Sequence, residues 1–258
     1  MSFKTKKSLG QHFLHDQNII SKILKSVNAA EHDRIIEIGS GTGALTRGLA
    51  QYYPDLHAIE LDTRAIEILS RDVPGLIVHH ADVLKINWPE LISAESDTYI
   101  IGNLPYYITS PILFSLLESR LLFKEAVLMM QKEVARRLVA SPSTKDYGIL
   151  SVQTQLMCTP ELLFDVSPNS FSPPPNVMST VIRLTFNKPA LPCTDKGLKT
   201  VVRTAFNQRR KKLSNSLKPV LGDFLPEGYD FDKRAEHWQP AVYANLTEFL
   251  EKETDILS

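Results

Sequence analysis

Four polar sites recur at nearly even intervals in the first half of the chain, and each directly follows a short apolar run. The sites are the glycine-rich segment 39–43 (Gly-Ser-Gly-Thr-Gly), Glu60, Asp82 and the segment 103–106 (Asn-Leu-Pro-Tyr). A strand with its crossover helix takes roughly 20 residues or a little more. The spacing therefore predicts that all four sites meet at one edge of a parallel sheet, beyond the carboxyl ends of its strands, where open α/β sheets bind their ligands.

The hydrophobic pattern predicts the elements around these sites. Strands are expected over 34–38, 56–59, 76–79, 98–101 and 126–130. Helices are expected over 17–27, 45–50, 64–70 and 133–139. Two alternating stretches, 149–157 and 177–186, predict an antiparallel pair at the sheet edge. The prolines of 167–175 predict a stiff exposed loop between them, because proline cannot donate to a sheet ladder.

A proline-containing segment, 187–192, predicts a domain boundary. Residues 1–187 are expected to form the α/β domain, with a basic amino-terminal arm over 1–16, and residues 188–258 a small helical domain. No apolar run approaches the roughly 20 residues of a membrane helix. The two cysteines form no disulfide framework, which favours reduced thiols in a cytosolic protein. The histidine pairs 12/15 and 79/80 have no cysteine or carboxylate cluster beside them, so no metal is expected.

Charge is balanced overall but unevenly distributed. The chain has 29 basic and 29 acidic residues, so its total gives no hint of a nucleic-acid partner. From Lys196 to Gly222, however, there is no acid, and residues 209–212 are four consecutive cations. Such a run suits phosphate contacts whose strength falls with salt. The alternative is a solvated helix face.

The glycine segment predicts a ligand-binding turn. Glycines allow positive φ and close approach of a ligand, and the following helix offers free amide donors. Glu60 would accept hydrogen bonds from two ribose hydroxyls, and Asp82 a hydrogen bond from an adenine amino group. A tight turn without ligand and a helix-capping Asp82 are the alternatives. Because Ala44 also satisfies the relaxed dinucleotide fingerprint, a nicotinamide-dependent dehydrogenase stays open.

The segment Asn103-Leu104-Pro105-Tyr106 suits chemistry on an amine. The lone pair of an adenine amine is delocalised into the ring. The Asn103 side-chain oxygen and the Leu104 carbonyl can accept its N–H bonds and aim the nitrogen, while Pro105 stiffens the turn. Tyr106 offers a flat face to an extruded base. A capping asparagine beside a core tyrosine is the alternative.

With these motifs, the chain resembles the S-adenosylmethionine-dependent ribosomal RNA adenine dimethyltransferases, above all the bacterial enzymes that act on small-subunit rRNA. The resemblance extends over almost the whole chain. It is carried by the segments 7–14, 37–43, 103–107, 171–175 and 203–212, together with Glu60 and Asp82.

The resemblance implies a Rossmann-like methyltransferase fold and dimethylation of adenine N6 in two adjacent adenosines of the 3′-terminal hairpin of 16S rRNA. It implies S-adenosylmethionine as methyl donor and no metal. The implied cofactor-binding residues are His12, Leu14, Gly39, Gly41, Glu60, Asp82, Val83 and Asn103. The implied catalytic residues are Asn103, Leu104, Tyr106 and Phe171, with Phe171 stacked on the second face of the base. The implied RNA-binding residues are Lys7, Arg203, Arg209, Arg210, Lys211 and Lys212.

The expected roles of His12 and Phe171 differ in detail from the family pattern or have an alternative. The family commonly has asparagine where His12 stands, so a backbone contact is expected there rather than a side-chain contact. Taken alone, the Phe171 position favours a loop aromatic that covers the core. A monomer that acts in the cytoplasm on a pre-ribosomal particle is expected. A large-subunit rRNA adenine methyltransferase of the resistance type and a ribosome-assembly factor that acts by binding remain alternatives.

Overall fold

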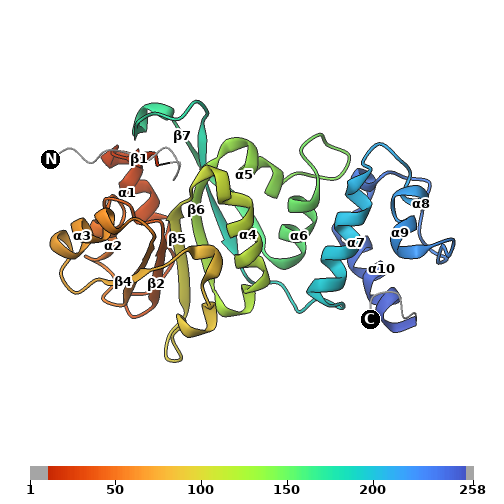
Figure 1. The fold of residues 1–258 in the computed structure, drawn as a ribbon, viewed down its shortest axis with the longest axis horizontal. Helices are drawn as coiled ribbons and strands as arrows, with labels where there is room; N and C mark the ends of the chain where they lie inside the picture. The colour runs from red at the N-terminus through yellow and green to blue at the C-terminus, as the bar shows by residue number, and fades with distance from the viewer. Residues whose placement is uncertain (1–10, 254–258) are drawn as a thin grey trace. The chain divides into compact units, whose positions relative to one another are not determined.

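The apolar runs form the strands of a seven-stranded sheet in the computed structural model, which describes residues 11–253 (Figure 1). The strand order is β4-β3-β2-β5-β6-β9-β7. The bounds are β2 (Arg34–Ile38), β3 (Leu56–Glu60), β4 (Ile77–His80), β5 (Thr98–Asn103), β6 (Glu125–Gln131), β7 (Thr159–Val166) and β9 (Ser179–Thr185). Strands β2 to β6 pair in parallel, and β9 runs antiparallel to β6. The expected mostly parallel sheet with an antiparallel edge is confirmed.

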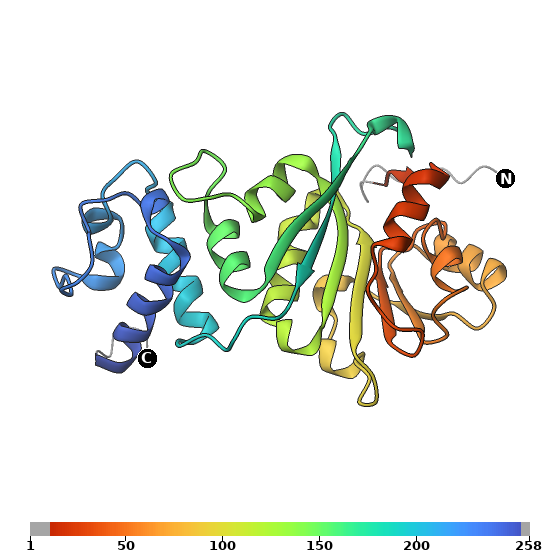
Figure 2. The ribbon, with the colours of Figure 1, turned by 180° about the vertical axis from the view of Figure 1, so that it is seen from behind.

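Helices cover both faces of this sheet. The helices of the chain are α1 (Gln17–Lys25), α2 (Thr46–Leu49), α3 (Thr63–Asp72), α4 (Thr109–Glu118), α5 (Lys132–Leu138), α6 (Ile149–Met157), α7 (Asp195–Asn207), α8 (Leu213–Ser216), α9 (Lys218–Leu221) and α10 (Pro240–Glu253). Right-handed crossovers put α2 and α3 on one face and α4 on the other, because the chain moves across the sheet in opposite directions from β2 and from β5. Helix α4 lies in front of β5 and β6 in Figure 1, and Figure 2 shows these strands from the other side.

Short 3-10 helices join several of these elements. They are η2 (Val83–Lys85), η3 (Trp88–Glu90), η4 (Tyr106–Ile108), η5 (Arg120–Leu122), η6 (Pro168–Ser170) and η7 (Ala235–His237). After β2 the next strands are added toward one edge of the sheet, and after β5 toward the other edge. The boundary between β2 and β5 is therefore the topological switch point of the sheet. Ligands bind outside the strand carboxyl ends at such a point.

The chain divides into two compact units. The sheet unit holds the chain up to Ala135 together with Glu161–Phe186, and the helical unit holds Arg136–Pro160 and the chain from Asn187. Residues 136–160 thus lie in the second unit, whereas the sequence placed them in the domain of residues 1–187. The reason is the packing of α6 against α7 and α10.

The segment 149–157 is a helix, and its prediction as a strand was wrong. Its side chains at Val152, Thr154 and Met157 are buried, and Gln155 Nε2 donates to the carbonyls of Leu138 and Ala140. The strand beside β9 is β7 instead. Alternating polar and apolar residues fit a half-buried strand, but here tertiary packing decides the conformation.

A second, two-stranded sheet joins distant parts of the sheet unit. Strand β1 (Phe13–Leu14) pairs antiparallel with β8 (Phe171–Ser172), so Leu14 lies opposite Phe171. Both side chains are buried in one hydrophobic cluster that also includes Ile20 and Ile35. The segment 167–175 was predicted to be exposed; its residues Ser170 and Phe171 are buried because β1 covers them.

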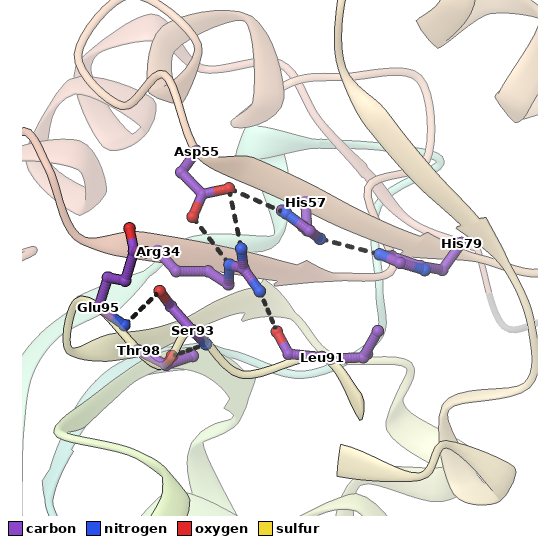
Figure 3. Close-up of polar contacts among 8 residues, drawn as sticks. All are labelled: Arg34, Asp55, His57, His79, Leu91, Ser93, Glu95 and Thr98. Carbon is purple, nitrogen blue, oxygen red and sulfur yellow. Dashed lines mark hydrogen bonds and ion pairs between the residues drawn. The ribbon is translucent and has the colours of Figure 1, made fainter. Parts of the chain in front are cut away.

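The amino ends of the strands carry a polar network of their own (Figure 3). Arg34 Nε donates to Asp55 Oδ2 at 2.8 Å and its Nη1 to the Leu91 carbonyl at 2.9 Å. Asp55 Oδ1 lies 3.0 Å from His57 Nε2, and His57 Nδ1 lies 2.9 Å from His79 Nε2. Because the Asp55 carboxylate can only accept, His57 donates to it and accepts from His79. This network ties β2, β3 and β4 together at the edge opposite the predicted site.

Candidate functional site: a cavity at the strand carboxyl ends

A cavity of about 230 Å³ lies at the carboxyl ends of β2, β3, β4 and β5. All four polar sites recognised in the sequence line it. Its wall is made of residues 11–14, 37–42, 44–45, 59–61, 81–84 and 103–108. All eight residues predicted to bind a cofactor belong to this lining, as do Asn103, Leu104 and Tyr106 of the predicted catalytic group.

The glycine turn after β2 is shaped by backbone conformation and by packing. Gly39 and Gly41 have φ of +69° and +52°, a region that disfavours side chains. A Cβ on Gly41 would also lie 3.0 Å from the Phe13 ring. Gly41 N donates to Glu60 Oε2 at 2.7 Å, which fixes the turn against the end of β3.

The Glu60 carboxylate is held by backbone donors. Its Oε1 accepts from the amides of Leu61 and Asp62, each at 2.8 Å, and the residue is 8% exposed. Its position is therefore set by the chain itself. A carboxylate has about four lone-pair directions, so it keeps capacity to accept from a ligand hydroxyl.

Asp82 has the capping role that the sequence allowed, and one of its carboxylate oxygens stays free of hydrogen bonds to the described residues. Its Oδ1 accepts from Leu84 N at 3.0 Å and so begins η2. Its other oxygen has no hydrogen-bond partner among residues 11–253. Val83, which follows, is 7% exposed and adds apolar surface to the lining.

Glu37 is the buried acid that sequence reasoning missed. It lines the cavity, is 2% exposed, and its Oε2 has no hydrogen-bond partner among the described residues. Burial raises the pKa of this carboxyl group to about 7. The signal was available, because Glu37 interrupts the apolar run of β2 directly before the glycine turn.

Asn103 stands at the end of β5 with its amide oriented. Its Nδ2 donates to the His12 carbonyl at 3.1 Å, and no described residue donates to its Oδ1. The turn that follows is rigid. Leu104 N donates to the Met129 carbonyl at 2.9 Å, and Thr109 Oγ1 donates to the Pro105 carbonyl at 3.0 Å.

Tyr106 is held at its edge and covered on one face. Its hydroxyl lies 2.5 Å from Ser179 Oγ, and burial raises the pKa of the phenol. The His12 ring stacks on the Tyr106 ring with a centroid distance of 5.5 Å and an angle of 27° between the planes. The His12 Nδ1 in turn lies 2.8 Å from the Pro173 carbonyl. The flat face predicted for a base thus carries an imidazole in this structure.

Phe171 does not belong to the cavity lining. It is 2% exposed and packs with Leu14 in the core of the sheet unit. Of the two interpretations that the sequence allowed, the structure has the core aromatic, because pairing of β8 with β1 turns the ring inward. A stacking role for Phe171 therefore finds no support in this arrangement.

The predicted RNA-binding residues that the structure describes are not part of the cavity lining. Lys7 lies outside the described residues, and the other five belong to the helical unit. Arg209 Nη2 donates to the carbonyls of Thr144 and Lys145, and Lys212 pairs with Asp232 at 2.8 Å. The side chains of Arg203, Arg210 and Lys211 are exposed, and no ion pair joins them to another described residue.

Residues 11–253 contain no group of three or more histidine, cysteine or acidic side chains arranged to hold a metal ion. Within the same residues, the helices are all too short or too polar to span a bilayer.

Known proteins resemble this chain along nearly its whole length. A profile of the ribosomal RNA adenine dimethylase family matches residues 2–250. The ribosomal RNA small subunit methyltransferase A of Salinibacter ruber is 45% identical over 259 residues, covering 98% of this chain and 87% of the relative. Its counterpart in Pseudomonas aeruginosa is 44% identical over 251 residues, covering 94% of this chain and 93% of the relative.

Solved structures agree with this relationship. A dimethyladenosine transferase from Plasmodium falciparum matches with a TM-score of 0.78 and 27% identity, over 94% of this chain and 99% of its own. The 23S rRNA methyltransferase ErmE matches with a TM-score of 0.66 and 26% identity, over 93% of this chain and all of its own. A family profile over nearly every residue, together with relatives above 40% identity, leaves one conclusion: the chain belongs to the ribosomal RNA adenine dimethylase family.

Proposed function

We propose that this protein transfers methyl groups from S-adenosylmethionine to adenine N6, twice per base, in two adjacent adenosines near the 3′ end of small-subunit rRNA. The names of its relatives in Salinibacter ruber and Pseudomonas aeruginosa support the small subunit as the target. One structural observation carries the proposal: Asn103 and Tyr106 line the same cavity as Glu60 and Asp82. Groups suited to a base thus share one space with groups suited to a nucleoside cofactor.

The residues of the cavity fit S-adenosylmethionine. When bound, this cofactor supplies a methyl group on a positively charged sulfur. Glu37 offers a buried carboxyl group whose Oε2 has no hydrogen-bond partner among the described residues, which suits a ligand that donates a hydrogen bond. Glu60, which is fixed at the end of β3, would accept from the ribose, and the free oxygen of Asp82 would accept from the adenine amino group. The backbone amides of the glycine turn suit the carboxylate of the methionine portion.

The catalytic work falls to the turn after β5. The Asn103 Oδ1 and the Leu104 carbonyl would accept the two N–H bonds of the target amine, because Asn103 Nδ2 is already engaged by His12. Tyr106 would support the ring of the base by stacking. Much of the acceleration in such a transfer comes from holding two reactants in line at short distance.

The helical unit would hold the RNA by its phosphates. Its cations Arg203, Arg210 and Lys211 support this role, because they are exposed and no ion pair with another described residue occupies them. They can therefore contact phosphate oxygens. We further propose that the protein acts as a monomer, in the cytoplasm and on a pre-ribosomal particle.

The decisive experiment is transfer of tritiated methyl groups to purified small-subunit particles that lack the modification, with the labelled nucleoside identified. We expect N6,N6-dimethyladenosine from the wild-type protein. Asn103→Ala should lower transfer by about 100-fold or more, the usual effect of removing an oriented polar group from a reacting centre. Calorimetry should show cofactor binding largely retained.

A matched control is Asn87→Ala, which removes an exposed asparagine that bonds only Glu90. This variant should keep wild-type transfer. Turnover at the wild-type rate in the Asn103 variant would contradict the proposal. Label that enters large-subunit rRNA instead would support the resistance-type alternative, with which the ErmE fold is compatible.

A further inference from the structure

The strongest unassigned contact in the cavity wall joins Tyr106 to a strand on the antiparallel side of the sheet. The Tyr106 hydroxyl and Ser179 Oγ are 2.5 Å apart. Ser179 is the first residue of β9 and lies opposite Gln131 at the end of β6. It is fully buried. Ser179 lies within the predicted strand 177–186, but its residue type alone indicated no functional role.

Because Ser179 is buried, this hydrogen bond favours one position of the Tyr106 ring. A hydroxyl that is buried without a partner is disfavoured. Among the described residues, Tyr106 is the only side chain that bonds Ser179 Oγ. If the Tyr106 ring rotated away from β9, the serine hydroxyl would be left unpaired in the interior. The pair therefore holds the outer end of the tyrosine ring in one place.

The position of the ring matters because a face of Tyr106 takes part in stacking. In this structure the His12 imidazole lies on it, at a centroid distance of 5.5 Å. The ring is thus already oriented to receive a flat aromatic group, beside the oriented amide of Asn103. A phenylalanine would offer the same face but no hydroxyl at its edge.

We infer that Ser179 is a positioning residue for methyl transfer, which anchors the Tyr106 ring at the cavity wall through the hydroxyl–hydroxyl hydrogen bond. This inference rests on the proposed function, in which the target adenine stacks on Tyr106. Its consequence is that the tyrosine hydroxyl and the serine hydroxyl act as a unit. Removal of either one should free the ring, and removal of the second should add nothing.

A double-mutant cycle on the full-length protein tests this. Tyr106→Phe and Ser179→Ala should each lower kcat about tenfold, and the double variant should also be about tenfold slower rather than a hundredfold, since groups in direct contact are not additive. The KM for S-adenosylmethionine should stay near the wild-type value in all three proteins. A merely structural role for Ser179 would lower thermal stability without this coupling in kcat.

Thr180→Val is the matched control. Thr180 is the next residue of β9, is buried, and donates its hydroxyl to Asp165 at 2.7 Å. Its loss should lower stability and leave kcat unchanged. Additive effects of the two single variants in an active enzyme, or an unchanged kcat in Ser179→Ala, would overturn the inference alone. A wild-type protein that methylates neither rRNA would overturn the proposed function and this inference together.

Discussion

The buried Glu37 in the cavity wall should make the stability of the protein depend on pH. Burial raises the pKa of Glu37 to about 7, from 4.5 for an ordinary glutamate. Between these values the folded protein holds a proton that the unfolded chain has released, so stability falls as pH rises through this window. At about 1.4 kcal/mol per pKa unit, wild type should lose roughly 2–3 kcal/mol relative to Glu37→Gln between pH 5 and pH 8. Urea unfolding of both proteins at the two pH values measures this, and a constant difference would contradict it.

His12 contributes to the site in two separable ways. Its carbonyl accepts from Asn103, while its ring covers the face of Tyr106. We expect His12→Asn to keep the backbone contact and to vacate the stacking face. Because the target base no longer displaces a ring, RNA should bind about fivefold more tightly, equivalent to roughly 1 kcal/mol of stacking.

The measurement for His12 is the KM for small-subunit particles at saturating cofactor, with kcat recorded in parallel. The kcat of His12→Asn should remain close to that of wild type. A large fall in kcat, or weaker RNA binding, would show that the imidazole itself takes part in base recognition.

Strands β2, β3 and β4 share a network that should make the sheet edge sensitive to acid (Figure 3). Burial lowers the pKa of His57 and of His79 below 6.5, and Arg34 lowers both further. Below pH 6.5 the unfolded chain therefore takes up protons that the folded protein resists, and stability falls as pH falls. A protonated His57 also loses the acceptor that His79 needs.

The variant that isolates this effect is His57→Gln, which keeps one donor and one acceptor but does not titrate. Between pH 7.5 and 5.5 it should lose less stability than wild type in chemical denaturation. Glu37 gives the opposite slope in this window but is common to both proteins, so it cancels in the comparison. Equal losses in the two proteins would show that the histidine pair is not the sensor.

Elements also show where sequence reasoning reaches its limit. The sheet and its binding edge were predictable because each polar site follows its own strand, so local pattern and spacing were enough. Helix α6 was not predictable, because polar residues stand at every second position, Ser151, Gln153 and Gln155, as in a half-buried strand. The helices that bury α6 come more than 35 residues later in the chain. Phe171 was ambiguous for the same reason, since its partner Leu14 lies far away in the sequence.

At the scale of the whole molecule, acidic and basic residues are concentrated in different parts of the chain, although the net charge is zero. The cavity wall carries the acids Glu37, Glu60 and Asp82, which suit a cationic cofactor. The helical unit carries the acid-free basic segment 196–222. Zero net charge therefore does not argue against RNA as a partner, because local potential rather than total charge steers a polyanion.

This sorting predicts which cations of the basic run contact phosphate. Arg210 and Lys211 are exposed without an ion-pair partner among the described residues, whereas Arg209 bonds the carbonyls of Thr144 and Lys145. Arg210→Ala and Lys211→Ala should each reduce the slope of log affinity against log salt by about one, as loss of one phosphate contact does. Arg209→Ala should instead lower the melting temperature and leave the slope nearly unchanged. Filter binding of small-subunit rRNA over a salt series, with calorimetry of the cofactor as control, separates the two outcomes. If only Arg209→Ala reduced the slope, Arg209 would be the residue that contacts phosphate, and its bonds to the carbonyls of Thr144 and Lys145 would be less important than its contact with RNA.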